Sequence, residues 1–241
     1  MFVSILQRLE PILKKLYRKF VPPPPPHLSP VPPQAGDRDI EYSWIAANMP
    51  EGPGNALDFG SGQSYMGLIA ARKGFNTIAL DLEPVRWFYK HPRFKFIQGD
   101  ILKLQFPPSY FDLIINCSAI EHVGLAGRYG VTKDRPDGDI EAMKILKIIL
   151  KPGGKMLLTI PVGQDNVFKP LHRVYGKERL PRLLEGWEIL KEEYWIKDEE
   201  GYWICVDKET ALGREITHPS LYGLGLFVLQ KPIGDKKRLN R

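Results

Sequence analysis

Between residues 37 and 160, short apolar runs alternate with segments whose apolar residues recur at every third or fourth position. Apolar runs of this length predict buried strands, and the three-and-four spacing predicts helices. The expected strands are 55–59, 76–80, 94–97, 111–117 and 155–160. The expected helices are one with Asp37 as its N-cap that runs through Ala47, then 65–73, a short one after Pro84, 140–150 and 177–185. This alternation predicts a parallel sheet that is covered on both faces.

The pattern changes after residue 185. Residues 188–196, 202–206 and 224–230 are typical of strands that are joined by turns. An antiparallel edge is therefore expected on a mostly parallel sheet. The fold class predicted from the residues is α/β, with a doubly wound sheet.

The first 36 residues have a different pattern from the rest of the chain. Residues 2–21 predict an amphipathic helix with basic residues beside its apolar stripe, and the prolines of 22–36 predict a semi-rigid linker. The expected organisation is a helix at 1–21, a linker at 22–36, a domain at 37–232 and a basic tail at 233–241. The helix has three interpretations: it lies on an anionic membrane, docks on a partner, or folds back on the domain. The basic residues favour the membrane, and the linker argues against folding back.

Composition and charge limit the functions that the chain can have. Its 241 residues fit one α/β domain. Cys117 and Cys205 lack CxxC spacing, so neither a disulfide framework nor a metal site is expected. The net charge is +6, but residues 1–21 and 231–241 each carry +4, which leaves −2 for the rest. Basic charge on the folded part is the usual footprint of nucleic-acid binding, so no nucleic-acid partner is expected.

The same features predict the location of the protein. No apolar run reaches the roughly 18 residues of a membrane span, and the first residues lack the apolar core of a secretory signal. The sparse cysteines fit a reducing compartment. We therefore expect a cytoplasmic protein with peripheral membrane contact through residues 2–21.

Three successive strands are followed by residues that suit a nucleoside ligand. The first strand runs into Gly60-Ser61-Gly62, whose glycines let the backbone approach a ligand closely. The second ends at Asp81, which can accept ribose hydroxyls, and the third leads to Asp100, which can accept from an adenine amine. Because the carboxyl ends of parallel strands share one crevice, these residues predict an adenosine-containing ligand. A dinucleotide is disfavoured, because Tyr65 stands where a third glycine would be needed.

In order and spacing, five segments resemble the motifs of class I S-adenosylmethionine-dependent methyltransferases, most closely those of the type 11 group. The segments are 57–62, Asp81, 99–100, 111–116 and 150–154, and the resemblance covers about residues 40–165. It implies a seven-stranded sheet of order 3-2-1-4-5-7-6 with an antiparallel seventh strand. It also implies S-adenosylmethionine as the cofactor and methyl transfer as the reaction.

The resemblance further implies roles for individual residues. Residues 60–62 would hold the methionine part of the cofactor, Asp81 the ribose and Asp100 the adenine. The expected cofactor-binding residues are Asp58, Gly60, Ser61, Gly62, Asp81, Leu82, Asp100, Ile101 and Asn116. The chain departs from many family members at Ser64, where they have a third glycine, but the first two glycines are those that make the turn.

The segment 118–130 resembles the EHxGL…GRYG loop of a little-characterised branch of this family. It follows the fourth strand, at the end expected nearest the transferred methyl group. Methyl transfer to a hydroxyl needs an aligned acceptor and a group that removes its proton, and the intrinsic pKa of His122 suits that role. Glu121 could orient His122. The alternative is that Glu121 and His122 only brace the loop or pack on the cofactor.

Two further groups of residues are candidates for contacts with the substrate or for catalysis. Arg128 and Tyr129 either contact the substrate or cap the glycine-rich loop. His172, Arg173 and Tyr175 follow the fifth strand, where the connection often covers the acceptor pocket in this fold. His172 is thus a second catalytic candidate, and Arg173 and Tyr175 are substrate candidates. The alternative is a solvated basic turn.

The function expected from the sequence is methyl transfer to an oxygen of a small-molecule, lipid-linked or glycan acceptor. Residues 116–119 do not form the Asn-Pro-Pro-Tyr signature of base-nitrogen methylation, and the N-terminal helix would suit a lipid-linked or glycan precursor. Two alternatives stay open: an RNA or protein methyltransferase, and a cofactor-binding module without catalysis that scaffolds an assembly.

Overall fold

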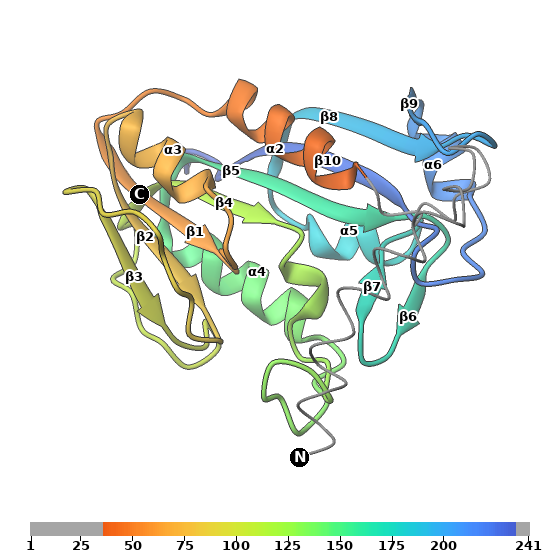
Figure 1. Ribbon diagram of the computed structural model, residues 1–241, viewed down its shortest axis with the longest axis horizontal. Coiled ribbons are helices and arrows are strands. Elements are labelled where there is room, and N and C mark those ends of the chain that lie inside the picture. The colour runs from red at the N-terminus through yellow and green to blue at the C-terminus, as the bar shows by residue number, and fades with distance from the viewer. Residues whose placement is uncertain (1–35, 235–241) are drawn as a thin grey trace, which may run out of the picture. The chain divides into compact units, whose positions relative to one another are not determined.

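An eight-stranded sheet forms the centre of the computed structural model, which describes residues 36–234 (Figure 1). Its strand order is β3-β2-β1-β4-β5-β10-β8-β9. Its strands are β1 Gly54–Phe59, β2 Phe75–Asp81, β3 Phe94–Gln98, β4 Phe111–Cys117, β5 Leu150–Val162, β8 Glu188–Lys197, β9 Trp203–Val206 and β10 Gly223–Gln230. The first five strands in this order are parallel to one another, and β10 is antiparallel to both β5 and β8. A separate hairpin consists of β6 Asn166–Phe168 and β7 His172–Val174.

Helices cover both faces of the sheet. They are α2 Asp37–Asn48, α3 Met66–Arg72, α4 Gly138–Ile149, α5 Arg179–Leu183 and α6 Lys208–Gly213, with a 3-10 helix, η1, at Ile120–His122. In Figure 1, α2 and α3 lie on one face, and α4 and α5 lie on the other. The pleat explains this division: Ile115 packs with the α2 and α3 residues, whereas its neighbour Ile114 packs with those of α4 and α5.

The predicted fold class is confirmed. The strand order 3-2-1-4-5-7-6 is found when β10 is counted as the seventh strand and β8 as the sixth, and β9 adds an eighth strand at the edge. Most predicted elements agree with the structure to within a few residues. The short helix expected after Pro84 is wrong, because residues 84–90 contain no helix. Asp37 is the first helical residue, and the cap is Gly36 at φ 82°.

The sheet register brings the predicted ligand-binding residues together. Phe59 pairs with Leu80 on one side and with Asn116 on the other. Asp81 pairs with Gln98. The residues that follow these strands, from Gly60, Leu82 and Gly99 onward, therefore leave the same edge of the sheet.

The predicted helix 1–21, most of the linker 22–36 and most of the tail 233–241 lie outside the described residues. Within 36–234, no helix combines the length and apolar character needed to cross a membrane.

Candidate active site

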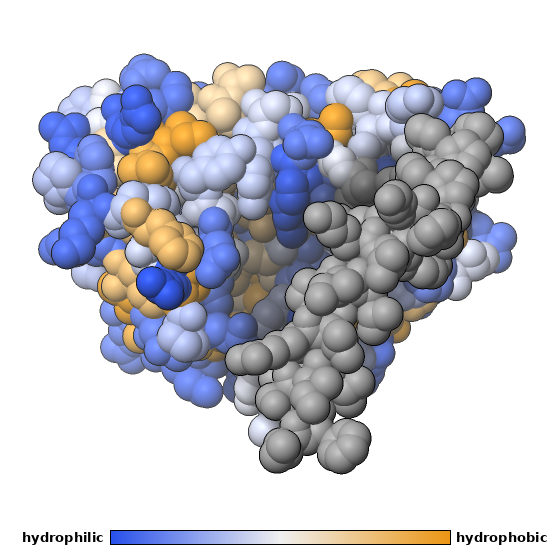
Figure 2. Space-filling view, in the orientation of Figure 1, coloured by the Kyte–Doolittle hydropathy of each residue, from blue (hydrophilic) through white to orange (hydrophobic). Residues whose placement is uncertain are grey.

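A cavity of about 860 Å³ lies at the carboxyl ends of β1, β2, β3 and β4. Figure 2 shows this face of the molecule hollowed near its centre. Residues 60–62, Asp81 and Asp100 line one side, and His122 and Arg128 line the other. The volume is in the upper part of the range for small-molecule sites.

The turn after β1 brings the backbone to the cavity wall. Gly60 has φ +63° and Gly62 has φ +50°, a region that side chains other than glycine rarely adopt. A Cβ at Gly60 would lie 2.3 Å from the Cβ of Ala119. A Cβ at Gly62 would meet nothing within 4 Å, and the buried hydroxyl of Ser61 has no hydrogen-bond partner among the described residues. The turn therefore offers open space and an unused polar group to a ligand.

Asp81 and Asp58 lie on neighbouring strands, but they differ in whether their carboxylates can accept hydrogen bonds from a ligand. Asp81 is half-buried and accepts from the N–H groups of Gly62 at 2.8 Å and Glu83 at 3.0 Å, which leaves lone pairs on both of its oxygens. Asp58 is buried at the cavity wall and accepts from the N–H of Gly67 at 2.9 Å. Burial raises the pKa of Asp58 to about 7. Asp58 thus anchors the start of α3, whereas Asp81 has the capacity to accept from a ligand.

Of the other residues predicted to bind the cofactor, three line the cavity and Asn116 does not. Leu82, Asp100 and Ile101 line the cavity. Asp100 accepts from the N–H of Leu102 at 2.9 Å and pairs with Lys103 at 3.3 Å. Asn116 does not line the cavity; it is fully buried, and neither of its amide atoms has a hydrogen-bond partner within the described part of the chain.

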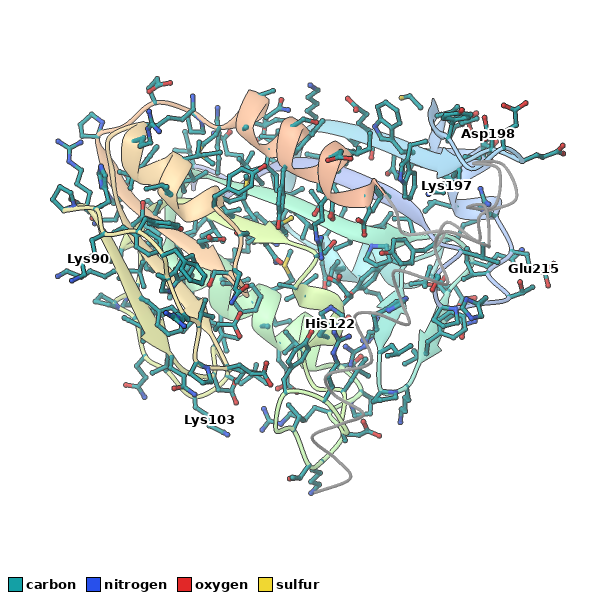
Figure 3. The ribbon with its side chains drawn as sticks, in the orientation of Figure 1. Lys90, Lys103, His122, Lys197, Asp198 and Glu215 are labelled. Carbon is teal, nitrogen blue, oxygen red and sulfur yellow. The ribbon has the colours of Figure 1, made fainter. Side chains whose placement is uncertain are left out.

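His122 lies at the end of η1, beside the carboxyl ends of the central strands (Figure 3). Its Nδ1 is 2.6 Å from the carbonyl oxygen of Leu171. A carbonyl only accepts, so this contact places the proton of the neutral ring on Nδ1 and leaves a lone pair on Nε2. Burial, helped by the charge of Arg128, lowers the pKa of the imidazole to about 4. The ring is therefore neutral at pH 7 and can accept a proton at Nε2.

Glu121 stands behind His122 and outside the cavity lining. Its Oε1 is 3.7 Å from Nε2 of His122, and its Oε2 has no hydrogen-bond partner among the described residues. Burial raises the pKa of this carboxyl to about 8. Glu121 is therefore mostly protonated at pH 7, and a proton gained by His122 would favour its ionised form.

Arg128 and Tyr129 both line the cavity. The guanidinium carbon of Arg128 lies 4.5 Å from the centre of the Tyr129 ring, a cation–π contact. The Tyr129 ring meets the His122 ring edge to face at 5.6 Å. Tyr129 has φ +52°, a strained conformation for a residue other than glycine, and such strain recurs at functional sites.

The substrate contacts expected from Arg173 and Tyr175 are not supported, and neither is a solvated turn. Both residues are buried and absent from the cavity lining. Arg173 donates to the carbonyls of Glu121 at 3.2 Å and Val123 at 2.7 Å, and also to those of Arg135 and Pro136. Tyr175 donates to Asp139 at 3.1 Å. Arg173 therefore braces the loop after β4 from behind.

His172 is buried next to this brace and does not line the cavity. Its ring lies 6.3 Å from that of His122 and 5.3 Å from that of Tyr222. Burial lowers the pKa of His172 to about 4, so the ring is neutral at pH 7. Its position supports packing against His122 rather than contact with a ligand.

The sequence interpretation missed the contribution of α2. Arg38 and Tyr42 line the cavity. Glu41 is fully buried between Arg38, Ser118 and Thr159, and accepts from the Thr159 hydroxyl at 2.6 Å. The signal was present: Glu41 falls on the apolar stripe of the helix, beside Trp44 and Ile45, where a carboxylate needs partners.

A family model described as a Caenorhabditis protein of unknown function, DUF268, matches residues 101–208, a region that includes the loop of His122. A comparison with curated protein sequences finds no match. The type 11 resemblance is therefore not confirmed by a family model.

Solved structures with the same fold are numerous. A 1,6-didemethyltoxoflavin-N1-methyltransferase from Burkholderia thailandensis, bound to S-adenosylhomocysteine, is 16% identical with TM-score 0.55 and covers 83% of this chain and 79% of its own. The cyclase SpnF is 18% identical with TM-score 0.56 and covers 83% and 82%. A phosphoethanolamine N-methyltransferase from Haemonchus contortus is 17% identical with TM-score 0.53 and covers 80% and 52%. The described domain has the Rossmann-like fold of these proteins, and a cyclase among them demonstrates that the fold alone does not define the reaction.

Proposed function

We propose that the protein transfers a methyl group from S-adenosylmethionine to a hydroxyl oxygen of a small-molecule, lipid-linked or glycan acceptor. The observation that carries this proposal is the convergence of the glycine turn, Asp81 and a neutral His122 in one cavity. The methyltransferases of the same fold that were crystallised with S-adenosylmethionine or S-adenosylhomocysteine support the choice of cofactor.

The residues on one side of the cavity fit such a cofactor. We call Gly60, Ser61, Gly62, Asp81, Leu82, Asp100 and Ile101 the cofactor half. The turn supplies the open space at Gly62 and the unpartnered Ser61 hydroxyl, and Asp81 has free lone pairs for ribose hydroxyls. When bound, the cofactor supplies an electrophilic methyl group on a sulfonium.

The residues on the other side suit the acceptor. We call Arg38, His122, Arg128, Tyr129 and Lys133 the acceptor half. The acceptor hydroxyl would donate its hydrogen to Nε2 of His122, which takes the proton as the oxygen attacks. The Nδ1–H bond to Leu171 holds the ring in the tautomer that this step requires. Glu121, 3.7 Å away, would stabilise the resulting imidazolium.

The experiment that tests this proposal is incubation of the full chain with methyl-labelled S-adenosylmethionine and fractionated cell extract. Label is expected in a small-molecule, lipid or glycan fraction, and Asp81→Ala and His122→Ala should each reduce it. Label in RNA or protein would contradict the acceptor class. Cofactor binding without labelling of any fraction would favour a module without catalysis.

Peripheral membrane contact through residues 2–21 is a separate part of the proposal. The five basic residues of this segment support attraction to anionic lipid. Full-length protein should sediment with anionic vesicles at low salt and lose this binding in high salt, whereas protein without residues 1–33 should stay in the supernatant. Equal sedimentation of both forms would contradict membrane contact.

A further inference from the structure

The two halves of the cavity carry opposite charge. The acidic lining residues Asp58, Asp81, Glu83 and Asp100 lie near the carboxyl ends of β1, β2 and β3. One basic residue, Lys103, lines the same side and pairs with Asp100 at 3.3 Å. The basic residues of the opposite side come from α2 and from the loop after β4, and they are Arg38, Arg128, Lys133 and Arg135. A wall that is lined by one sign of charge attracts ligands of the opposite sign.

Two of these four cations already have carboxylate partners. Arg38 pairs with the buried Glu41, and Arg135 pairs with Glu141 at 3.2 Å. Arg128 and Lys133 form no ion pair with any residue of the described range 36–234. Their positive charges are therefore not balanced by an acidic side chain of this part of the chain.

The loop that carries Arg128 and Lys133 is held in one shape. Asp134 accepts from the N–H of Ala126 at 2.9 Å and pairs with Lys169, outside the cavity lining. The N–H of Gly127 donates to the carbonyl of Val131 at 2.9 Å. Asp134 is the single acid among residues 118–135 other than Glu121, and its carboxylate is already paired with Lys169.

Arg128 is also close to the proton acceptor of the proposed reaction. Its guanidinium lies 4.5 Å from the centre of the Tyr129 ring, which in turn lies 5.6 Å from that of His122. Arg128 and His122 therefore contact the same tyrosine ring, and a group bound by Arg128 would lie close to the imidazole. The planar guanidinium is suited to bidentate binding of phosphate and carboxylate oxygens.

We propose that Arg128 and Lys133 form an oxyanion-binding subsite, which recognises a phosphate or carboxylate group of the acceptor near the hydroxyl that His122 deprotonates. This inference rests on the proposed function and names its substrate class. The two cations would hold the anionic group and thereby align the hydroxyl with His122.

The test is a titration of the full chain, saturated with S-adenosylhomocysteine, with inorganic phosphate or with acetate at constant ionic strength. The readout is the NMR signal of the His122 ring, which is identified by its absence in His122→Ala; the chain has five histidines. One or both anions should shift this signal in a saturable way, and chloride should not. Saturation by phosphate alone would indicate a phosphorylated acceptor, and saturation by acetate alone would indicate a carboxylate.

Variants decide whether the two cations are responsible. Arg128→Gln and Lys133→Gln should each weaken anion binding about tenfold or more, the usual worth of a charged hydrogen bond, and Arg128→Lys should restore part of the affinity. Lys90→Gln is the matched control, because Lys90 is exposed, does not line the cavity and lies well away from His122 in Figure 3. Equal weakening by Lys90→Gln, or no saturable shift with either anion, would overturn the inference.

The failure of the proposed function would look different. S-adenosylhomocysteine binding is measured first by calorimetry. If it does not bind, the proposed function fails, and the anion titration of the ligand-free protein still tests the subsite. If it binds and neither anion does, only the subsite is wrong.

Discussion

In the cofactor half of the cavity, every functional residue lies at the end of a strand or within four residues of it, whereas the acceptor half depends on contacts between distant segments. Asp81 is the last residue of β2, and Asp100 follows β3 by two positions. His122 is oriented by Leu171, and its loop is braced by Arg173, about 50 residues along the chain. The register of the sheet is sufficient to build the first half, but the second needs the rest of the domain to be packed.

The largest effect is expected from the acceptor half. His122→Ala removes the proposed proton acceptor, so turnover should fall by roughly 10²- to 10⁴-fold while cofactor affinity stays nearly unchanged. His172→Ala should lower turnover less, because His172 is outside the cavity lining. Since the pKa of His122 is lowered to about 4, wild-type activity should not decline as pH falls from 7 to 6. Full turnover by His122→Ala, measured once the acceptor is known, would make the histidine structural.

The second-largest effect is expected on the stability of the acceptor half, where a buried and an exposed arginine can be compared. Arg173→Met keeps much of the side-chain volume but leaves the carbonyls of Glu121 and Val123 without a donor, and it removes one of the cations beside buried Asp139. The carbonyls of Arg135 and Pro136 still accept from Gly138 and Arg179. The free energy of unfolding should fall by about 3 kcal/mol, the scale of buried groups left unsatisfied. Arg128→Gln, on the exposed surface of the same loop, should change it by less than about 0.5 kcal/mol. Urea unfolding of the two variants measures both changes. If the two variants lose a similar amount of unfolding free energy, Arg173 does not differ from Arg128 in its contribution to stability.

A smaller effect is expected in the cofactor half. Asp81→Ala removes the carboxylate proposed to accept ribose hydroxyls, so S-adenosylhomocysteine affinity should weaken by about 1.5–3 kcal/mol. The fold should persist, because the Asp81 side chain is only half-buried and its partners are backbone N–H groups at the surface of the turn. Calorimetry measures the affinity, with Glu83→Gln as the neighbouring control. Unchanged binding to Asp81→Ala would contradict the assignment of the cofactor half.

This contrast explains how much of the molecule was predictable from the sequence. The fold class and the positions of Gly60, Asp81 and Asp100 followed from apolar runs and strand ends, since both signals are local. The hairpin of β6 and β7 was not predicted, and Arg173 and Tyr175 were therefore assigned to substrate instead of to the interior. A three-residue strand is too short to have a periodic pattern, and the burial of Arg173 depends on four carbonyls from other segments.

The smallest expected effect is on the pH dependence of the unfolding free energy, to which the two halves contribute over different pH ranges. Burial raises the pKa of Asp58, beside the cofactor half, to about 7, and that of Glu121, behind the acceptor half, to about 8. Their ordinary values are 3.8 and 4.5, so between the ordinary and raised values the folded chain holds a proton that the unfolded chain has released. The free energy of unfolding therefore falls as pH rises through each window. The pKa of His122 and of His172, each lowered from 6.5 to about 4, has the opposite effect, but only below about pH 6.5.

Above pH 7 the window of Asp58 is largely complete, and that of Glu121 is still open. Between pH 7 and 8, wild-type protein should therefore lose about 1 kcal/mol of unfolding free energy through Glu121. Glu121→Gln should show little of this loss. Asp58→Asn should retain it and should differ in slope from wild type below about pH 7, within the window of Asp58. Urea unfolding at half-unit pH steps measures both windows. If the unfolding free energies of wild type and Glu121→Gln change equally with pH above 7, Glu121 is already ionised in the folded chain. The imidazolium formed at His122 would then be stabilised by a carboxylate that is charged before the reaction begins.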